Sequence, residues 1–278
     1  GVINMNNLKK VGLTALAGAL VSVSANAAEL SVTGGASISF AGEEKTTKGN
    51  GWSMNDGLTF SASVEQDNGW TITAKQVIDS SDGAAGAIMD TRTLTIDMGD
   101  SGSLVFAGDG GSSVMDAVDD VTPTANEEAW ADVTGASAAV GGTGGNNMFT
   151  YSNSSLMDGL KISASYTPSD GATQVESSDD YGFEYTGVDG LKIGAAFGDD
   201  NTSSTAGESK STMYAVYTFD AFSVGFQASE NDSETASSDV DFTALGVSYA
   251  VSDDMSISLN SSTHEYEDST KSDQEATG

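Results

Sequence analysis

Hydrophobic and polar residues alternate with a period of two along most of the chain. In residues 58–64 every second residue is apolar and the residues between are Thr or Ser, and the same alternation recurs in 160–166, 191–197 and 222–228. A period of two is typical of a β-strand with one apolar and one polar face. The pattern predicts about 13 strands. They are expected at 29–41, 58–66, 70–78, 91–98, 103–108, 147–153, 160–166, 180–185, 191–197, 211–219, 222–229, 239–249 and 255–262.

The connections between these strands alternate between short and long. Residues 67–69 and 220–221 are short connections, whereas 42–57 and 109–146 are long. Up-and-down membrane barrels have short turns at one end and long loops at the other. A soluble sandwich shares the alternation of faces, but its connections have no reason to alternate in length. We therefore expect an all-β fold, an antiparallel transmembrane β-barrel.

In such a barrel the apolar parity faces lipid and the polar parity faces water. The positions that we expect to face lipid are Leu58, Phe60, Val64, Leu160, Ile162, Leu191, Ile193, Phe222, Val224 and Phe226. A sandwich would instead bury these side chains against a second sheet.

The first 27 residues have the three parts of a secretion signal. Lys9 and Lys10 form the positive start, residues 11–23 form a short apolar run, and Ala25 and Ala27 supply the small residues of a cleavage site. The run is shorter than the about 20 residues that a membrane-spanning helix needs. We expect residues 1–27, which include upstream residues before Met5, to be removed and residues 28–278 to form the barrel domain.

The charge of the chain is strongly acidic. Asp and Glu number 41 against 10 Lys and Arg, a formal net charge of −31, which becomes −33 when the predicted signal is removed. Such a surface repels nucleic acid, so nucleic acid is excluded as a partner. The acidic excess either supports solubility or attracts cations, and composition alone favours the first. Because the chain has no cysteine, a thiolate metal site is also excluded.

One connection is much longer than the others. Residues 109–146 span 38 positions after the fifth predicted strand and contain seven acidic residues but no Lys or Arg. Connections of this length inside a compact domain are uncommon and usually functional.

These features together resemble the general porins of Gram-negative outer membranes. The segments ELSVTGGASISFAG (29–42), DGLTFSASV (56–64) and DGLKISASY (158–166) are similar to that family, and the resemblance covers residues 28–278. It implies an exported outer-membrane barrel of the 16-stranded type, embedded in lipid and assembled as a homotrimer. It also implies a water-filled channel through which small hydrophilic solutes and ions diffuse passively.

The resemblance also implies roles for charged residues. In such porins the third long loop folds into the barrel and narrows the pore, and its carboxylates face basic residues on the wall. The candidate constriction residues are Asp109, Asp116, Asp119, Asp120, Glu127, Glu128 and Asp132. The candidate basic residues of the wall are Lys75, Arg92, Lys161 and Lys192. A confined loop with acids and no bases predicts a channel that prefers cations.

Three features depart from the family pattern. About 13 strands are predicted where such barrels have an even number, and the chain ends in a polar stretch without a closing strand or terminal aromatic residue. We expect the sequence to be a fragment that is incomplete at its C-terminus and lacks about three strands. A rich set of wall arginines, which the family often has, is also missing from the sequence.

The sequence gives little support for other chemistry. The single histidine, His264, follows the last predicted strand and is expected to be a solvated loop residue, so no acid–base arrangement can be built around it. No glycine-rich phosphate loop opens a helix, and the acids do not have EF-hand spacing, so neither a cofactor nor a metal is expected.

Two alternative functions share some of these features. A secreted acidic adhesin or β-solenoid would need a fixed short repeat, of which only Asp56-Gly57-Leu58, Asp158-Gly159-Leu160 and Asp189-Gly190-Leu191 give a trace. A ligand-specific barrel would need aromatic residues on its polar parity, whereas the aromatic residues here mostly share the apolar parity.

Overall fold

The computed structural model describes residues 28–41, 51–79, 89–125, 145–169, 176–201, 207–233, 239–268 and 271–278. Its regular structure there is β-strand apart from two single turns of 3-10 helix, η2 (Gly99–Ser101) and η3 (Asp116–Val118). Within these ranges no helix combines the length and apolar character needed to cross a bilayer. The expected signal, residues 1–27, lies outside the described residues.

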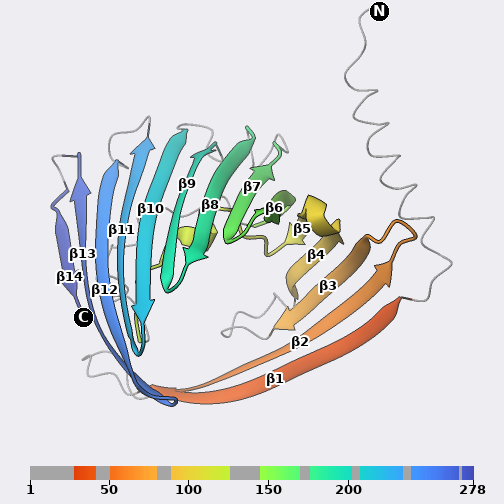
Figure 1. Ribbon diagram of the computed structural model, residues 1–278, viewed down its shortest axis with the longest axis horizontal. Helices are drawn as coiled ribbons and strands as arrows, with labels where there is room; N and C mark the ends of the chain where they lie inside the picture. The colour runs from red at the N-terminus through yellow and green to blue at the C-terminus, as the bar shows by residue number, and fades with distance from the viewer. Residues whose placement is uncertain are drawn as a thin grey trace, which may run out of the picture. The chain divides into compact units, whose positions relative to one another are not determined.

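Fourteen antiparallel strands follow one another in chain order in one sheet, so each pairs with its neighbours in sequence (Figure 1). This up-and-down order confirms the predicted fold class. The strands are β1 (Glu29–Ala41), β2 (Gly51–Glu65), β3 (Thr71–Asp79), β4 (Met89–Asp97), β5 (Ser103–Asp109), β6 (Met148–Met157), β7 (Leu160–Thr167), β8 (Ser178–Val188), β9 (Leu191–Asp200), β10 (Glu208–Phe219), β11 (Phe222–Ser233), β12 (Val240–Ser252), β13 (Met255–Tyr266) and β14 (Gln274–Thr277).

The first thirteen strands match the thirteen predicted ones, and the differences lie at the ends. β2 begins at Gly51 rather than at residue 58. Trp52 and Met54 share the apolar parity of Leu58, but Asp56 interrupts the alternation, and the pairing with β1 continues through that interruption. β14 was not predicted, since its sequence QEAT has no apolar period. It is held through backbone hydrogen bonds with β13, which continue to Gly278 opposite Asn260.

His264 corrects a prediction. It lies within β13, which extends to Tyr266, and only 2% of its surface is exposed. Its ring contacts Phe242 on β12 with 4.8 Å between centroids. The expectation of a solvated loop residue was therefore wrong, because the polar sequence after residue 262 continues the strand.

The chain forms two compact units, residues 1–99 and 100–278. In the first unit, β1 to β4 pair in register, with Leu58 opposite Ile78 and Val64 opposite Ile72. Residues directly opposite each other on antiparallel strands share a face of the sheet. The apolar parity of these strands therefore forms one face, and the Ser and Thr positions form the other.

Short turns in the second unit explain the recurring Asp-Gly-Leu segments. Gly159 and Gly190 have positive φ values of 74° and 72° in the turns that precede β7 and β9. Glycine adopts this conformation without the steric cost that a Cβ would add. The third copy, at Gly57, lies inside β2 and is not a turn.

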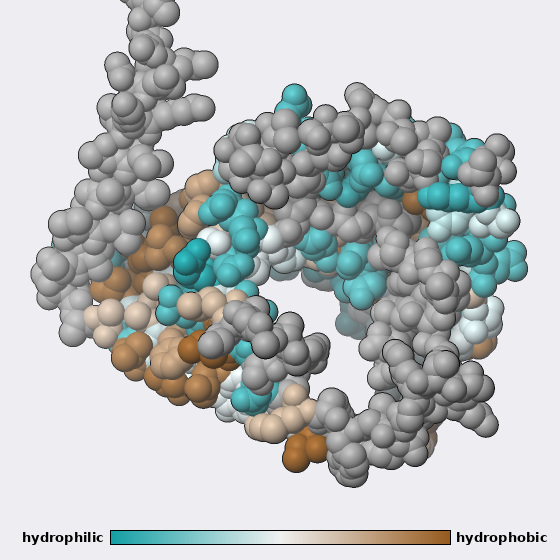
Figure 2. All heavy atoms as spheres, turned by 180° about the vertical axis from the view of Figure 1, so that it is seen from behind, coloured by the Kyte–Doolittle hydropathy of each residue, from teal (hydrophilic) through white to brown (hydrophobic). Residues whose placement is uncertain are grey.

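The strands of the second unit have one apolar and one polar face. We call "apolar face" the side that carries Phe222, Phe226 and Leu245, each 42–50% exposed. We call "polar face" the opposite side, which carries the buried Ser165, Asp180, Gln227 and Asn260. On the face that Figure 2 displays, hydrophobic and hydrophilic residues gather in separate areas.

The ten positions expected to face lipid are partly or well exposed, and none is buried. This arrangement contradicts a sandwich, in which the same residues would form a closed core.

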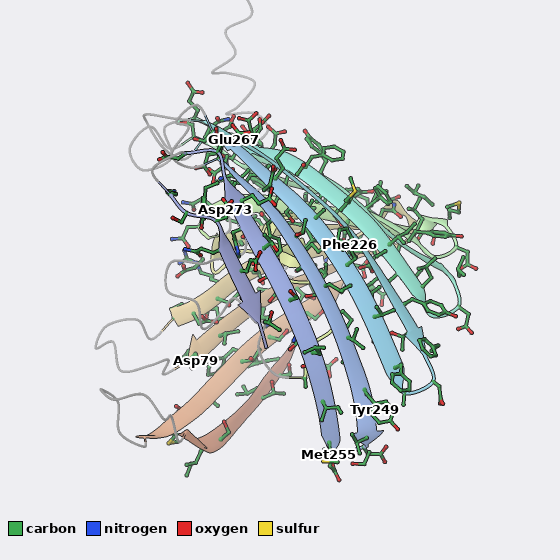
Figure 3. The ribbon with its side chains drawn as sticks, turned by 90° about the vertical axis from the view of Figure 1, so that its left-hand side faces the viewer. Asp79, Phe226, Tyr249, Met255, Glu267 and Asp273 are labelled. Carbon is green, nitrogen blue, oxygen red and sulfur yellow. The ribbon has the colours of Figure 1, made fainter. Side chains whose placement is uncertain are left out.

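Aromatic residues on the apolar face cluster at the short-turn end of β10 to β12. Tyr217, Phe219, Phe222 and Tyr249 form a chain of ring contacts with centroid distances of 5.7, 5.6 and 4.4 Å. In Figure 3, Tyr249 near the end of β12 and Met255 at the start of β13 lie together, while Glu267 and Asp273, between β13 and β14, lie toward the opposite end of β13. Such a cluster at a strand end fits an aromatic girdle at a membrane interface.

Candidate functional site

The segment that follows β5 lies against the polar face of the second unit. Its described residues run from Gly110 to Ala125, and Figure 1 shows its short helical turn, η3, beside the middle strands. The two ends of the connection meet at Gly111 and Gly145, whose backbone N–H groups each donate to the other's carbonyl oxygen over 2.7 Å. The connection therefore closes on itself near the end of β5.

The first attachment to the wall uses Ser165 on β7 and Asp180 on β8. The Val114 N–H donates to Ser165 Oγ (2.9 Å), whose hydroxyl donates to Asp180 Oδ2 (3.1 Å). The Met115 N–H also donates to Asp180 Oδ2, over 3.4 Å. Val114 and Met115 are themselves buried, so polar bonds and apolar packing act together at this point.

The second attachment is made by one side chain, Gln227 on β11, which is fully buried. Its amide Nε2 donates to the carbonyl oxygens of Val118 (2.8 Å) and Asp119 (3.0 Å). Its Oε1 accepts from the Val121 N–H over 3.2 Å. Gln227 thus satisfies backbone groups at the end of η3, where carbonyls lack partners within a short helix.

The third attachment lies farther along, on β13. The Ala125 N–H donates to Ser258 Oγ over 3.0 Å, and Asn260 Nδ2 donates to Thr124 Oγ1 over 3.4 Å. The described part of the segment therefore contacts the wall from β7 to β13, crossing the polar face rather than extending away from the strands.

Small residues on the wall make room for this crossing. A Cβ added to Gly182 would lie 2.7 Å from Val114 Cγ1, and one added to Gly246 would lie 2.6 Å from the Pro123 carbonyl oxygen. Gly225 likewise lies under the Pro123 ring. These glycines allow the segment to approach the strand backbones closely.

Three of the predicted acidic residues lie together on this segment. Asp116 Oδ2 accepts from the Ser113 N–H (2.8 Å) while the Asp116 N–H donates to Ser113 Oγ (3.2 Å), which fixes the start of η3. Burial raises the pKa of Asp119 to about 7, with further contributions from a hydrogen bond with Asp120 and from the charges of Asp120 and Asp116. The three carboxyl groups are therefore close enough to interact electrostatically.

The other predicted acids are placed differently. Asp109 is the last residue of β5 and lies on the wall rather than on the crossing segment. Glu127, Glu128 and Asp132 lie outside the described residues.

The predicted basic residues fall into two groups. Lys161 and Lys192 have the same parity as Ser163, Ser165 and Ala196, so they lie on the polar face that the segment contacts. Lys75 and Arg92 belong to the first unit, where Lys75 pairs with Thr93 and Gln76 pairs with Arg92. Because consecutive positions point to opposite faces, Lys75 and Arg92 lie on opposite faces of the sheet, and a role in the pore wall stays a prediction.

The residues that hold the segment were missed from the sequence. Asp180 is a carboxylate and Gln227 and Asn260 are amides, at polar-parity positions otherwise occupied mainly by Ser, Thr and Gly. Each of these side chains has more hydrogen-bonding groups than the Ser, Thr or Gly found at most positions of the polar face. Those additional groups were the sequence signal that could have identified the residues that hold the segment. Their partners, however, depend on where the segment crosses, which the sequence does not reveal.

The family model for Gram-negative porins matches residues 12–278 of the chain. The chain belongs to this family. This porin is therefore an outer-membrane channel protein with transmembrane β-strands, and the adhesin alternative is not favoured. No curated protein matches its sequence.

Solved structures with the same fold are distant in sequence. The anion-selective porin from Comamonas acidovorans superposes with a TM-score of 0.65 at 14% identity, covering 89% of this chain and 82% of that one. The trimer form of OmpT, an outer-membrane protein of Vibrio cholerae, gives 0.62 at 13% identity, with 91% and 82% covered. OmpF of Salmonella typhi, in complex with daunomycin, gives 0.60 at 12% identity, with 86% and 80% covered.

Proposed function

We propose that this porin forms a water-filled channel for the passive diffusion of small hydrophilic solutes, that it prefers cations, and that residues 109–146 constrict its bore. The observation that carries the proposal is the path of the described segment, which crosses the polar face through Ser165, Asp180, Gln227 and Asn260. A connection of an outer-membrane barrel that lies on the water-facing side of its own strands narrows the space there.

The preference for cations follows from the charges on the segment. Asp116, Asp119 and Asp120 lie within interaction distance of one another, and the segment carries no Lys or Arg. In a narrow channel, fixed carboxylates are less screened than on an open surface, so they raise the local concentration of cations and repel anions. Passage needs no catalytic residue, metal or cofactor.

The remaining parts of the proposal concern export and assembly. Cleavage after Ala27 would give a mature chain beginning at Ala28, which mass spectrometry of protein from outer membranes would show. Assembly as a homotrimer is supported by the trimer form of the V. cholerae relative. Light scattering of the detergent-solubilised protein would measure the number of chains.

The decisive experiment is the reversal potential of the full-length protein in planar bilayers under a salt gradient. The wild type is expected to prefer K⁺ over Cl⁻, and the triple change of Asp116, Asp119 and Asp120 to Asn is expected to weaken that preference. The control changes Asp253 and Asp254 to Asn, because these acids lie in the exposed turn between β12 and β13. An unchanged reversal potential in the triple variant would remove the selectivity role from this segment.

A further inference from the structure

A cavity of about 190 Å³ lies between the crossing segment and the polar face of β6 to β10. On the segment side it is lined by Val114, Ala117 and Val118, and on the wall side by Lys161, Glu184 and Tyr214. Cavities that hold drug-sized ligands measure about 300–1,000 Å³, so only a small solute fits here. The segment side of the cavity is apolar, and the strand side carries one positively and one negatively charged side chain.

The carboxylate of Glu184 is positioned by Tyr214 from two strands away. Glu184 on β8 is opposite Gly194 on β9, which is opposite Tyr214 on β10. The Tyr214 ring lies over Gly194, where an added Cβ would come within 2.7 Å of Cε1. Its hydroxyl donates to Glu184 Oε2 over 2.9 Å. Glycine at position 194 therefore allows the phenol to reach the carboxylate and draw it toward β10.

Lys161 on β7 is directly opposite Glu184 on β8, yet the two make no ion pair in the described structure. Cross-strand neighbours of opposite charge ordinarily attract each other, since their Cβ atoms are about 4.5–5.5 Å apart. Here the hydrogen bond from Tyr214 competes for the carboxylate, and the Lys161 side chain remains exposed. An ammonium and a carboxylate thus line one cavity without neutralising each other.

From this arrangement we infer that the cavity is a subsite for small zwitterionic solutes of the α-amino-acid class that carry a short apolar side chain. The solute carboxylate lies toward Lys161, its ammonium toward Glu184, and its side chain against Val114 and Val118. The inference rests on the proposed function, because solutes reach the cavity through the channel. Asp116, Asp119 and Asp120 disfavour a purely anionic solute, and Lys161 disfavours a purely cationic one.

The test is the single-channel conductance of the full-length protein with valine as the probe. Two analogues of valine separate the charges, since 3-methylbutanoate lacks the ammonium and isobutylamine lacks the carboxylate. Valine is expected to reduce the conductance saturably and reversibly. Each analogue is expected to need roughly tenfold higher concentration, because it loses one charge-assisted contact.

The sequence offers a matched pair of variants. Lys161 lines the cavity, whereas Lys271 is exposed in the connection between β13 and β14 and does not line it. Lys161→Met and Glu184→Gln are each expected to weaken the valine effect roughly tenfold, whereas Lys271→Met is expected to leave it within about threefold. Glutamine at position 184 still accepts from Tyr214, so the wall is preserved.

Several outcomes would overturn the inference. These are equal effects of valine and both analogues, equal effects of the two lysine variants, or no valine effect in a conducting, cation-preferring channel. The last outcome would leave the proposed function intact. If the folded protein does not conduct, the proposed function fails instead, and equilibrium dialysis of labelled valine against wild type and Lys161→Met still decides whether the subsite exists.

Discussion

The two faces of the strands in the second unit reverse the burial expected of a water-soluble domain. On the polar face the most buried side chains include Gln227, Ser262 and His264, whereas on the apolar face Leu245 and Ile257 are 50% and 58% exposed. Soluble proteins bury apolar side chains and leave amides and charges in water. The comparison shows that this fold places its apolar surface toward a medium outside the protein and uses polar contacts to hold the segment that crosses its polar face.

Placing a charged residue on the apolar face is expected to have the largest effect on the stability of the folded protein. Leu245→Arg places a charge opposite Phe226, in the middle of the apolar face. A charge on a lipid-facing position costs about 2–4 kcal/mol near the bilayer midplane. Denaturant unfolding in lipid vesicles would measure the decrease in the free energy of unfolding.

The control for this change is Ser248→Arg, on the same strand but on the polar face opposite Ser223. We expect it to be tolerated in unfolding experiments, because the new charge meets water. Equal destabilisation by the two arginines would contradict the assignment of the faces.

Removing the central contact of the polar face is expected to have the next largest effect. Gln227→Leu leaves the carbonyls of Val118 and Asp119 and the Val121 N–H without their partner. Each buried group left unsatisfied costs about 1–3 kcal/mol, less where water can enter. We expect lower stability and noisier single-channel currents, since the segment is held less firmly.

Gln76→Leu is the matched control, because Gln76 is exposed on β3. If Gln227→Leu leaves both the unfolding midpoint and the current noise at the Gln76→Leu level, the segment does not depend on this side chain.

The sequence predicted one face much better than the other. The apolar face needs only alternation, because lipid accepts many apolar side chains without specific partners, and so its positions were read directly from residues such as Phe222 and Val224. The polar face depends on pairs far apart in sequence, such as Gln227 with Val118, which no local pattern encodes.

The candidate site shows the same division. The length and the negative charge of the connection after β5 predicted that it has a functional role. The same features made Asp116, Asp119 and Asp120 candidate site residues. For Lys75 and Arg92, nearness in sequence to one loop does not fix which face each residue lies on, whereas strand register does, and it places them on opposite faces. The glycines under Pro123 had no recognisable signal, since glycine is frequent throughout the chain.

Adding a methyl group between the crossing segment and the strands beneath it is expected to have a smaller effect on stability. Gly225→Ala adds a methyl group beneath Pro123, so the segment must shift away from the wall. Overpacking of this kind typically costs about 1–3 kcal/mol, with the lower value expected where a segment can move. The change should alter conductance as well as the unfolding midpoint. At Gly35 an added methyl group meets no atom within 4 Å, so Gly35→Ala is the control and should change neither quantity.

The smallest expected effect is a change of selectivity with pH that arises from Asp119. Burial is the main cause that raises its pKa from 3.8 to about 7, followed by the hydrogen bond with Asp120 and the charges of Asp120 and Asp116. As the pH falls from 8 to 6, Asp119 takes up a proton and the segment loses one negative charge. The preference for cations should therefore decrease over this range and be restored on return to pH 8.

The same pKa fixes the sign of the effect on stability. A carboxyl group that binds its proton more tightly in the folded state contributes stability that is fully present below its unfolded pKa of about 3.8, and this contribution is lost as the pH rises through about 7. Asp119→Asn cannot ionise, so it should remove the step in reversal potential near pH 7 and give a weaker preference for cations at pH 8. Asp254→Asn, in an exposed turn, should keep the step. A wild-type reversal potential that is constant from pH 6 to pH 8 would mean that Asp119 does not control the ions in the channel, even if the segment crosses the polar face as the hydrogen bonds of Gln227 require.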